Sequence, residues 1–303
     1  MTRRPAAGQA CGLAVILLAT LLLSACGIVP ACRLEAVADL PATIEDNRLE
    51  VTGQVNGADI RLVVDTGAER SLLTTQTVAA LGLPRSQRSG TRLVGVGGTV
   101  SNADVYAQLA LGAATRAERL AVADIPGVGG VIGGDLLSRY DVELDVPGRR
   151  VRLWQATGCE VADLPWTGRR QAIAVDVTAT GRLRLPVTVD GQTMLALLDS
   201  GAALSLMQAD IARRMDVTPD ALAADPAYAA RGVDGTPIDV HRHRFGRLVV
   251  GMDRFARPLI GVAAFQLNAA DMLLGVDYLR VRRVWIAYRS GLVFVQSATP
   301  GGA

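Results

Sequence analysis

The stretch LVVDTGA at residues 62–68 decides the fold, and it returns as LALLDSGA at residues 195–202. In both copies an apolar run typical of a strand ends in an aspartate, Asp65 or Asp199. A small hydroxyl residue, a glycine and an alanine then follow. Burying a carboxylate beside an apolar run costs free energy unless the carboxylate is paired or hydrogen-bonded. The repetition therefore predicts that the two aspartates lie together and use each other.

The repeat extends well beyond the two aspartates. In each half, a hairpin dipeptide, Asn56-Gly57 or Asp190-Gly191, comes before the aspartate. Each aspartate is followed by a short helical pattern, a glycine-rich hairpin, an apolar-Gly-x-Asp turn and a last hairpin, in the same order. A long period with several matching elements indicates duplication of a whole lobe. We expect lobe 1 at residues 48–157, a linker at 158–168 and lobe 2 at 169–298.

The composition fits a compact sheet protein and excludes a polyanion-binding surface. Of the 303 residues, 50% are hydrophobic and only 4% are aromatic, and the net charge is +2. All 31 basic residues are arginine, and they are interspersed with acidic residues. Without a basic block, binding to nucleic acid is not expected.

The N-terminus has the pattern of a targeting segment. Arg3 and Arg4 precede an apolar run, residues 12–23, which is short for a membrane span and ends in Leu-Ser-Ala-Cys. This resembles a bacterial lipoprotein signal at residues 1–25, with Cys26 as the lipidated first residue and residues 26–47 as a leader. The resemblance implies an anchor in the cell envelope facing the periplasm, in the outer membrane rather than the inner one. The alternative is an ordinary secretory signal.

Taken together, these motifs resemble a known family over residues 48–298. An Asp-Thr/Ser-Gly-Ala turn after an apolar strand, a glycine hairpin and an Ile/Leu-Gly-x-Asp segment are similar to one lobe of a retropepsin-type aspartic protease. Two such lobes in one chain resemble the single-chain, pepsin-type arrangement. The resemblance implies an all-β fold of two acid-protease barrel lobes with a pseudo-two-fold axis, and a monomer that acts on extended peptides.

The family's mechanism would make Asp65 and Asp199 the catalytic pair, which activates a water molecule to hydrolyse a peptide bond. Neither a cofactor nor a metal is expected. Two carboxyl groups held close together do not both ionise easily, so they share one proton. Aspartic proteases are a standard example of this. The supporting residues would be those of the two turns and of two flap hairpins: Thr66, Gly67, Ser200 and Gly201 in the turns, and Gly95, Gly97, Gly98, Gly232 and Gly235 in the flaps.

The sequence departs from the pepsin pattern in two places. The first flap has no tyrosine, since Tyr106 lies beyond it, and alanine stands at positions 68 and 202, where pepsin-type lobes tend to carry a hydroxyl residue. Both features indicate retropepsin-like lobes. With fewer donors to keep the carboxylates ionised, a strongly acid pH optimum is not expected.

The remaining polar residues are interpreted structurally. Asp135 and Asp277 are expected to cap the short helical turns that follow them. His241 and His243 fit a solvated strand face. Outside the cytoplasm Cys32 and Cys159 are expected to form a disulfide, although two unpaired residues remain an alternative.

Two other functions stay open on the sequence alone. A catalytically silent relative could bind extended peptides in the same cleft. Alternatively, each lobe could pair with the same lobe of another chain, giving two separate aspartate sites.

Overall fold

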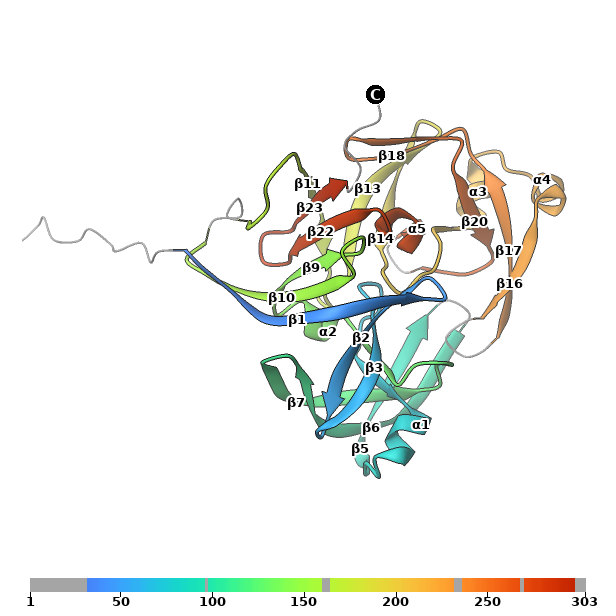
Figure 1. The fold of residues 1–303 in the computed structure, drawn as a ribbon. Coiled ribbons are helices and arrows are strands. Elements are labelled where there is room, and N and C mark those ends of the chain that lie inside the picture. The colour runs from blue at the N-terminus through green and yellow to red at the C-terminus, as the bar shows by residue number, and fades with distance from the viewer. Residues whose placement is uncertain (1–31, 96–97, 160–163, 232–235, 268–269, 298–303) are drawn as a thin grey trace, which may run out of the picture.

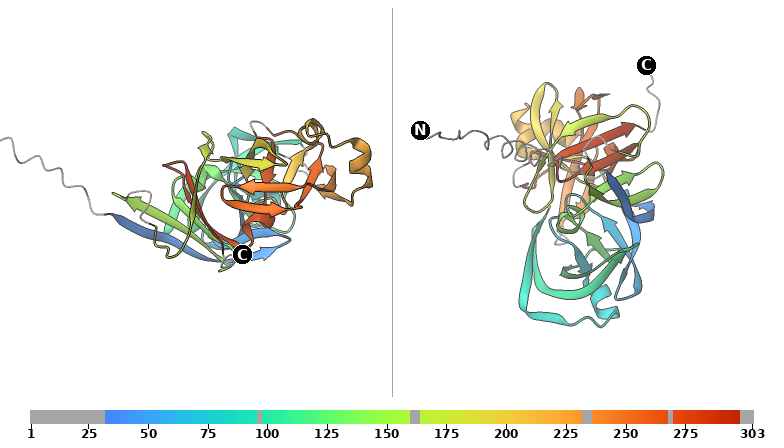
Figure 2. Two further views of the ribbon diagram at one scale, coloured as in Figure 1. Left: turned by 90° about the horizontal axis from the view of Figure 1, so that it is seen from above. Right: turned by 90° about the vertical axis from the view of Figure 1, so that its left-hand side faces the viewer.

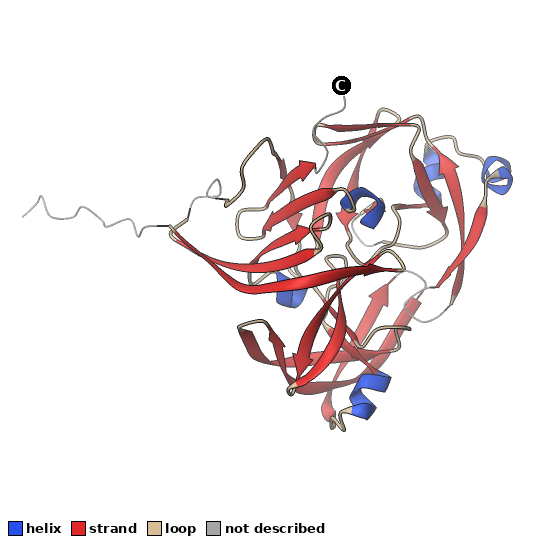
Figure 3. Cartoon of the chain, in the orientation of Figure 1, coloured by secondary structure: helices blue, strands red, loops and turns tan. Residues whose placement is uncertain are grey.

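The computed structural model describes residues 32–95, 98–159, 164–231, 236–267 and 270–297. It confirms the predicted all-β fold with two retropepsin-like lobes. Strands dominate the chain and the helices are short, as Figure 3 shows. In the described part of the chain, no helix is long and apolar enough to cross a membrane.

A six-stranded sheet built by both halves of the chain joins the lobes. Its order is β11-β23-β22-β9-β10-β1, and the central pair β9–β22 is antiparallel, with Asp145 opposite Arg283. Figure 1 shows β1 and β10 crossing the middle of the molecule between the two lobes. The strands are β1 (Arg33–Glu45), β9 (Asp141–Asp145), β10 (Arg150–Thr157), β11 (Gln171–Ala174), β22 (Arg282–Ala287) and β23 (Leu292–Ser297).

Lobe 1 is a closed barrel. Its strands follow the order β2-β3-β8-β4-β7-β6, and β6 pairs back with β2 through Gln54 and Ala110. The pairs β3–β8 and β4–β7 are parallel. The elements are β2 (Arg48–Val55), β3 (Ala58–Val64), β4 (Leu72–Thr74), α1 (Thr75–Ala80), β5 (Arg85–Gly95), β6 (Gly98–Leu111), β7 (Ala114–Ala123), β8 (Gly130–Ile132) and α2 (Gly134–Leu137).

Lobe 2 repeats this topology with β13, β14, β21, β15, β20 and β17 in the places of β2, β3, β8, β4, β7 and β6. The pairs β14–β21 and β15–β20 are again parallel. Figure 2 shows lobe 2, in yellow to red, on the opposite side of the joining sheet from lobe 1. The elements are β12 (Asp176–Val177), β13 (Leu183–Val189), β14 (Gln192–Leu198), β15 (Leu206–Gln208), α3 (Ala209–Arg214), α4 (Pro219–Ala224), β16 (Ala227–Arg231), β17 (Pro237–Arg244), β18 (Arg247–Val250), β19 (Asp253–Ala256), β20 (Leu259–Ala263), β21 (Met272–Leu274) and α5 (Val276–Leu279).

The two predicted hairpin turns have the backbone that their sequences favour. Asn56 and Gly57 have φ values of 49° and 85°, and Asp190 and Gly191 have φ values of 48° and 85°. Two successive residues at positive φ make the tight hairpin turn whose twist matches the flanking strands, and Asn-Gly and Asp-Gly tolerate it best. These turns fix the register of β2 with β3 and of β13 with β14, and so fix where each aspartate emerges.

The segment at residues 26–47 is not simply a leader. From Arg33 to Glu45 it forms β1, which pairs first with β10 and then with β2. The period-two pattern was hidden because the register shifts between Ala36 and Ala38, and because Pro41 lies inside the strand. Residues 1–31, including Cys26 and the signal, lie outside the described residues.

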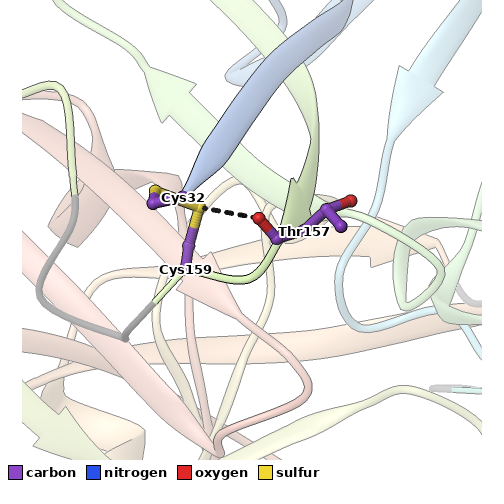
Figure 4. The surroundings of a disulfide bond; sticks show 3 residues. All are labelled: Cys32, Thr157 and Cys159. Atoms are coloured by element: carbon purple, nitrogen blue, oxygen red, sulfur yellow. Dashed lines mark hydrogen bonds between the residues drawn. A yellow bond between two sulfur atoms is a disulfide. The ribbon is translucent and has the colours of Figure 1, made fainter. Parts of the chain in front are cut away.

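A disulfide fixes the start of β1. Cys32 and Cys159 are bonded, with their Cα atoms 4.2 Å apart, at the point where Arg33 pairs with Thr157 of β10. Figure 4 shows the bond at the end of these two strands. It links residues 127 positions apart, and it therefore encloses the whole of lobe 1.

A buried carboxylate holds the linker against the joining sheet. Glu143 of β9 has no exposed surface and accepts hydrogen bonds from Trp154 Nε1 (3.0 Å) and Trp166 Nε1 (3.2 Å). Arg152 and Arg283 donate to it as well, at 3.0 and 2.6 Å. All three tryptophans of the chain lie here, since Trp285 packs against Trp154 and Trp166. Tryptophan fluorescence should therefore report the sheet that joins the lobes.

Candidate active site

Two equivalent strands deliver the two aspartates. Asp65 follows β3 and Asp199 follows β14. The backbone N–H of each aspartate adds one hydrogen bond to the parallel pairing of its strand, β3 with β8 and β14 with β21. The Asp65 N–H donates to the carbonyl of Ile132, and the Asp199 N–H donates to that of Leu274, each at 3.0 Å. The three residues directly before each aspartate, 62–64 and 196–198, are buried, so the strand is held in place and the carboxylate emerges at its end.

Each carboxylate is cradled by its own turn. Asp65 Oδ1 accepts hydrogen bonds from the backbone N–H groups of Gly67 (2.8 Å) and Ala68 (2.9 Å). Asp199 Oδ1 accepts the equivalent bonds from Gly201 and Ala202, both at 2.9 Å. Two backbone donors on one oxygen fix the orientation of each carboxyl group.

The glycines bring the two turns together. A Cβ atom added to Gly67 would lie 2.4 Å from Cγ of Asp199, and one added to Gly201 would lie 2.3 Å from Cγ of Asp65. Each carboxyl group therefore sits directly against the glycine of the other lobe, where only a missing side chain leaves room. The structure thus brings Asp65 and Asp199 together within one chain.

The hydroxyl residues interlock the lobes beneath the aspartates. The backbone N–H of Thr66 donates to Ser200 Oγ (3.0 Å), and the N–H of Ser200 donates to Thr66 Oγ1 (3.1 Å). Each hydroxyl group then donates across the interface, Thr66 to the carbonyl of Leu198 (2.7 Å) and Ser200 to that of Val64 (2.6 Å). Neither Thr66 nor Ser200 has any exposed surface.

The electrostatics of the pair favour a shared proton. Dense packing around the carboxyl groups raises the pKa of Asp65, while hydrogen bonds from Asp199 and the turn amides oppose this shift. For Asp199, burial, the charge of Asp65 and their mutual hydrogen bond raise the pKa well above its usual range. Both residues nevertheless keep part of their surface accessible to solvent. One ionised and one protonated carboxyl group side by side can act as base and acid on the same bound water.

A second pair of carboxylates supports the turns. Asp135 Oδ1 accepts from the backbone N–H and the hydroxyl group of Ser71 (2.8 and 2.7 Å), and Asp277 Oδ1 accepts from those of Ser205 (2.9 and 2.8 Å). The prediction of a structural role for these aspartates is correct, but the capping role is wrong. Both lie inside the first turn of their helices, α2 and α5, and each helix has a glycine at its N-cap.

The flap hairpins are only partly described. Gly95 ends β5 and Gly98 begins β6, whereas Gly97, Gly232 and Gly235 lie outside the described residues. The base of the first hairpin packs beside the active site, because Leu93 and Val100 join Ala68 around one apolar cluster. Gly95 and Gly98 therefore lie on a hairpin whose base packs beside the Asp65 turn.

The two histidines do not lie on a solvated face. His243 is half-buried, and its Nδ1 lies 2.6 Å from Asp225 Oδ2 at the end of α4, an element that the sequence pattern missed. Within the described ranges no three His, Cys, Asp or Glu side chains gather as metal ligands.

One interaction across the lobes had no signal in the sequence. Glu69, four residues after Asp65, forms an ion pair with Arg182 of lobe 2 at 2.5 Å. The corresponding residue of lobe 2 is Ala203, so the second turn lacks this contact. The serine contacts, by contrast, could have been found, because a serine follows both Asp65 and Asp199 by six residues and an aspartate follows each glycine turn.

Both halves match models of aspartyl protease families. An aspartyl protease model matches residues 51–136, and a model described as a gag-polyprotein putative aspartyl protease matches residues 185–281. The chain carries two aspartyl protease domains. Each matched domain contains one of the paired aspartates, Asp65 or Asp199, together with its supporting residue, Asp135 or Asp277.

A solved aspartic proteinase has the same arrangement of two domains. The crystal structure of the enzyme from Irpex lacteus superposes on this chain with a TM-score of 0.52 and 12% sequence identity. The match covers 88% of this chain and 99% of that one, so it includes both aspartyl protease domains and the sheet that joins them. At this identity the likeness concerns the fold alone. Among curated proteins, none matches this chain.

Proposed function

We propose that this protein is an aspartic endopeptidase in which Asp65 and Asp199 activate one water molecule. The observation that carries the proposal is the placement of the two carboxyl groups, each held by two N–H donors and each seated against the glycine of the other lobe. The raised pKa of both aspartates supports a pair that holds one proton between them.

The reaction needs only these two groups and water. The ionised carboxylate takes a proton from the water, whose oxygen attacks the scissile carbonyl carbon. The protonated carboxyl group donates its proton to the carbonyl oxygen as the tetrahedral intermediate forms. As the C–N bond of the intermediate breaks, the carboxyl group that took the water's proton gives it to the leaving nitrogen. A hydroxyl group of the intermediate gives its proton to the ionised carboxylate, so the pair is again singly protonated.

The sequence motifs indicate where the enzyme is located and on what it acts. We propose that lipidation at Cys26 anchors the chain in a bacterial cell envelope, facing the periplasm, and that the chain acts as a monomer on extended peptide or protein substrates. The disulfide Cys32–Cys159 supports an oxidising compartment, since such bonds persist outside the cytoplasm. Pairing of Asp65 with Asp199 inside one chain supports the monomer.

The central test replaces each aspartate by its neutral isostere. Asp65→Asn and Asp199→Asn should each reduce cleavage of a peptide library by at least about 10³-fold, because either change removes the acid–base pair. Asp220→Asn, at an exposed position in the first turn of α4, is the matched control and should keep full activity. Full activity in either active-site variant would rule out a shared pair. Peptide binding by the wild type without turnover at any pH would favour the silent relative.

A further inference from the structure

Lobe 1 buries a carboxylate outside the aspartate turns. Glu50 lies in β2, and its side chain is only 2% exposed. Arg48 Nη2 lies 3.6 Å from one of its carboxyl oxygens, and Arg61 Nη1 lies 3.6 Å from the other. Within the described residues, neither oxygen accepts a hydrogen bond. The two arginines are therefore the partners that compensate the buried charge, and we call these three residues the Glu50 cluster.

Both arginines also hold the loop at residues 124–129, which joins β7 to β8. Arg48 Nη1 donates to the carbonyl of Pro126 at 3.1 Å, and Arg61 Nη2 donates to the carbonyl of Gly127 at 2.6 Å. Each guanidinium group thus contacts Glu50 and the loop at the same time. The carboxylate fixes the position of two cations that bind two successive carbonyl groups.

This loop packs beside the turn of the first aspartate. Val128 of the loop and Val63 of β3 belong to one apolar cluster, and Ala68 packs against that cluster. Glu50 lies directly opposite Val63 in the pairing of β2 with β3. The backbone N–H of Ala68 is one of the two donors that orient Asp65. The loop therefore supports a residue that holds the carboxylate.

Lobe 2 holds the matching segment in another way. Asp271 precedes β21 and stands where lobe 1 has Gly129, and Leu195 stands where lobe 1 has Arg61. The N–H of Leu195 donates to Asp271 Oδ2 at 2.8 Å, so a side chain of the segment itself makes the contact. Glycine has no side chain for this purpose. In lobe 1 the contact comes instead from the arginines that Glu50 positions.

The charge of Glu50 does not serve the stability of the fold. Burial raises the pKa of its carboxyl group, Arg48 and Arg61 oppose the shift without cancelling it, and Glu45 and Asp46 add to it. Because the folded-state pKa is raised, the stability contributed by the bound proton is present at low pH and is lost as the pH rises through that pKa. The ionised form is the less favourable one for folding, although it is the form that attracts both arginines.

We propose that Glu50 is a positioning residue whose ionised carboxylate holds Arg48 and Arg61 on the loop at residues 124–129, and whose protonation releases the loop from the Asp65 turn. The effect on the loop is a property of the fold, whereas the effect on cleavage rests on the proposed endopeptidase function. Acid should act on this loop of lobe 1 and not on the matching segment of lobe 2.

The test compares the full-length wild type with a variant that keeps the shape of Glu50 and removes its charge, Glu50→Gln. Glu45→Gln is the matched control, because Glu45 also pairs with Arg61, at 3.0 Å, but is exposed (55%). Arg48→Gln removes one link to the loop and replaces Glu50→Gln if that variant does not fold. Hydrogen exchange of residues 124–131 is measured at each pH, and the main reporter is the Gly129 N–H, which donates to the Arg61 carbonyl at 2.9 Å.

Near neutral pH, residues 124–129 should exchange about 10-fold faster in Glu50→Gln than in the wild type, because a restrained segment loses a charged contact. The ratio of the two rates should fall toward one in acid, where the wild-type carboxyl group is protonated as well. Urea unfolding should find Glu50→Gln at least as stable as the wild type near neutral pH. Glu45→Gln should match the wild type in exchange and in stability.

Two results would overturn the proposal. One is an exchange ratio near one at every pH, or a ratio that does not change with pH. The other is a Glu50→Gln protein that loses global stability together with loop protection, since a purely structural residue would give that result.

Cleavage supplies a separate readout. If the loop positions Asp65, Glu50→Gln should lower kcat about 10-fold near neutral pH with little change in KM, and the difference should vanish in acid. An unchanged kcat beside the expected exchange ratio would reject the positioning role. If the wild type cleaves no peptide, the endopeptidase proposal fails, and the exchange ratio alone decides whether Glu50 controls the loop.

Discussion

The two aspartate turns, residues 65–71 of lobe 1 and 199–205 of lobe 2, share their hydrogen bonds but not their ion pairs. In both turns the carboxylate accepts two backbone bonds, the hydroxyl residue crosses to the other lobe, and a serine is held by a distant aspartate. Only lobe 1 adds charges, with Glu69 paired to Arg182 and Arg70 paired to Asp135. Lobe 2 has Ala203 and Leu204 in those places.

The comparison separates the contacts of the carboxylates, which match in the two turns, from the ion pairs, which do not. Groups that touch the carboxylates have the same geometry in both lobes, as the proposed sharing of one proton between two matched carboxyl groups requires. Groups one step further along the turns, Glu69 and Arg70 in lobe 1, form ion pairs with other side chains, and there the two copies differ. The symmetric contacts should therefore respond equally to mutation, and the asymmetric ones unequally.

The largest effect is expected at the interlock. Thr66→Val leaves the N–H of Ser200 and the carbonyl of Leu198 buried without a partner, and Ser200→Ala does the same to Thr66 and Val64. Each variant should lower the free energy of unfolding by about 2–4 kcal/mol. Urea unfolding followed by tryptophan fluorescence measures both. Unequal losses, with one variant near the wild type, would show that the interlock is not symmetric.

Asp135 and Asp277, which hold Ser71 and Ser205, test the difference in ion pairs between the lobes. Asp135→Ala and Asp277→Ala should each cost about 2 kcal/mol, because a buried serine loses its acceptor. Asp135→Ala should cost about 0.5–1 kcal/mol more, since Arg70 also loses its partner. In an Arg70→Leu background this excess should disappear, as a double-mutant cycle can measure. An excess that persists in that background would mean that Arg70 is not its source.

The pair itself should destabilise the fold as the pH rises. Because the folded-state pKa of Asp199 is raised well above its ordinary value, the native chain holds a proton that the unfolded chain has released. The stability contributed by that proton is present at low pH and is lost as the pH rises through the folded-state pKa. Asp199→Asn should match the wild type below the ordinary carboxyl pKa and become the more stable protein toward neutral pH. Thermal melts from pH 3 to 8 measure the difference, and a constant offset would argue against a raised pKa.

The smallest effect is expected at the ion pair between Glu69 of lobe 1 and Arg182 of lobe 2. Glu69 is partly exposed (43%), so Glu69→Ala and Arg182→Ala should each cost only about 0.5–1 kcal/mol. Their effects should not add in the double variant, because both changes remove one ion pair. Ala203→Glu, the matched change in lobe 2, is the control and should alter stability by less than about 0.5 kcal/mol. Additive losses would mean that each residue acts through other contacts.

Sequence reasoning succeeded where a local signal was repeated. The aspartate turns, the Asn56-Gly57 and Asp190-Gly191 hairpins and the order of elements were all readable, because each depends on a few adjacent residues and occurs twice. It failed where partners are distant and unrepeated. Nothing near Glu143 indicates that the linker residue Trp166 reaches it, and nothing near His243 indicates Asp225. The pattern of β1 was interrupted by its bulge, so a strand that pairs with two others was interpreted as a leader.

The bond between Cys32 and Cys159 makes lobe 1 a covalent ring. The chain enters and leaves this ring at one point, and lobe 2 extends from it as a branch. A single cut anywhere between residues 33 and 158 would open the ring but release no fragment, because both ends stay attached through the sulfurs. For a protein proposed to cut peptide chains, self-cleavage within lobe 1 would then leave the N-terminal segment and lobe 2 joined until the disulfide is reduced.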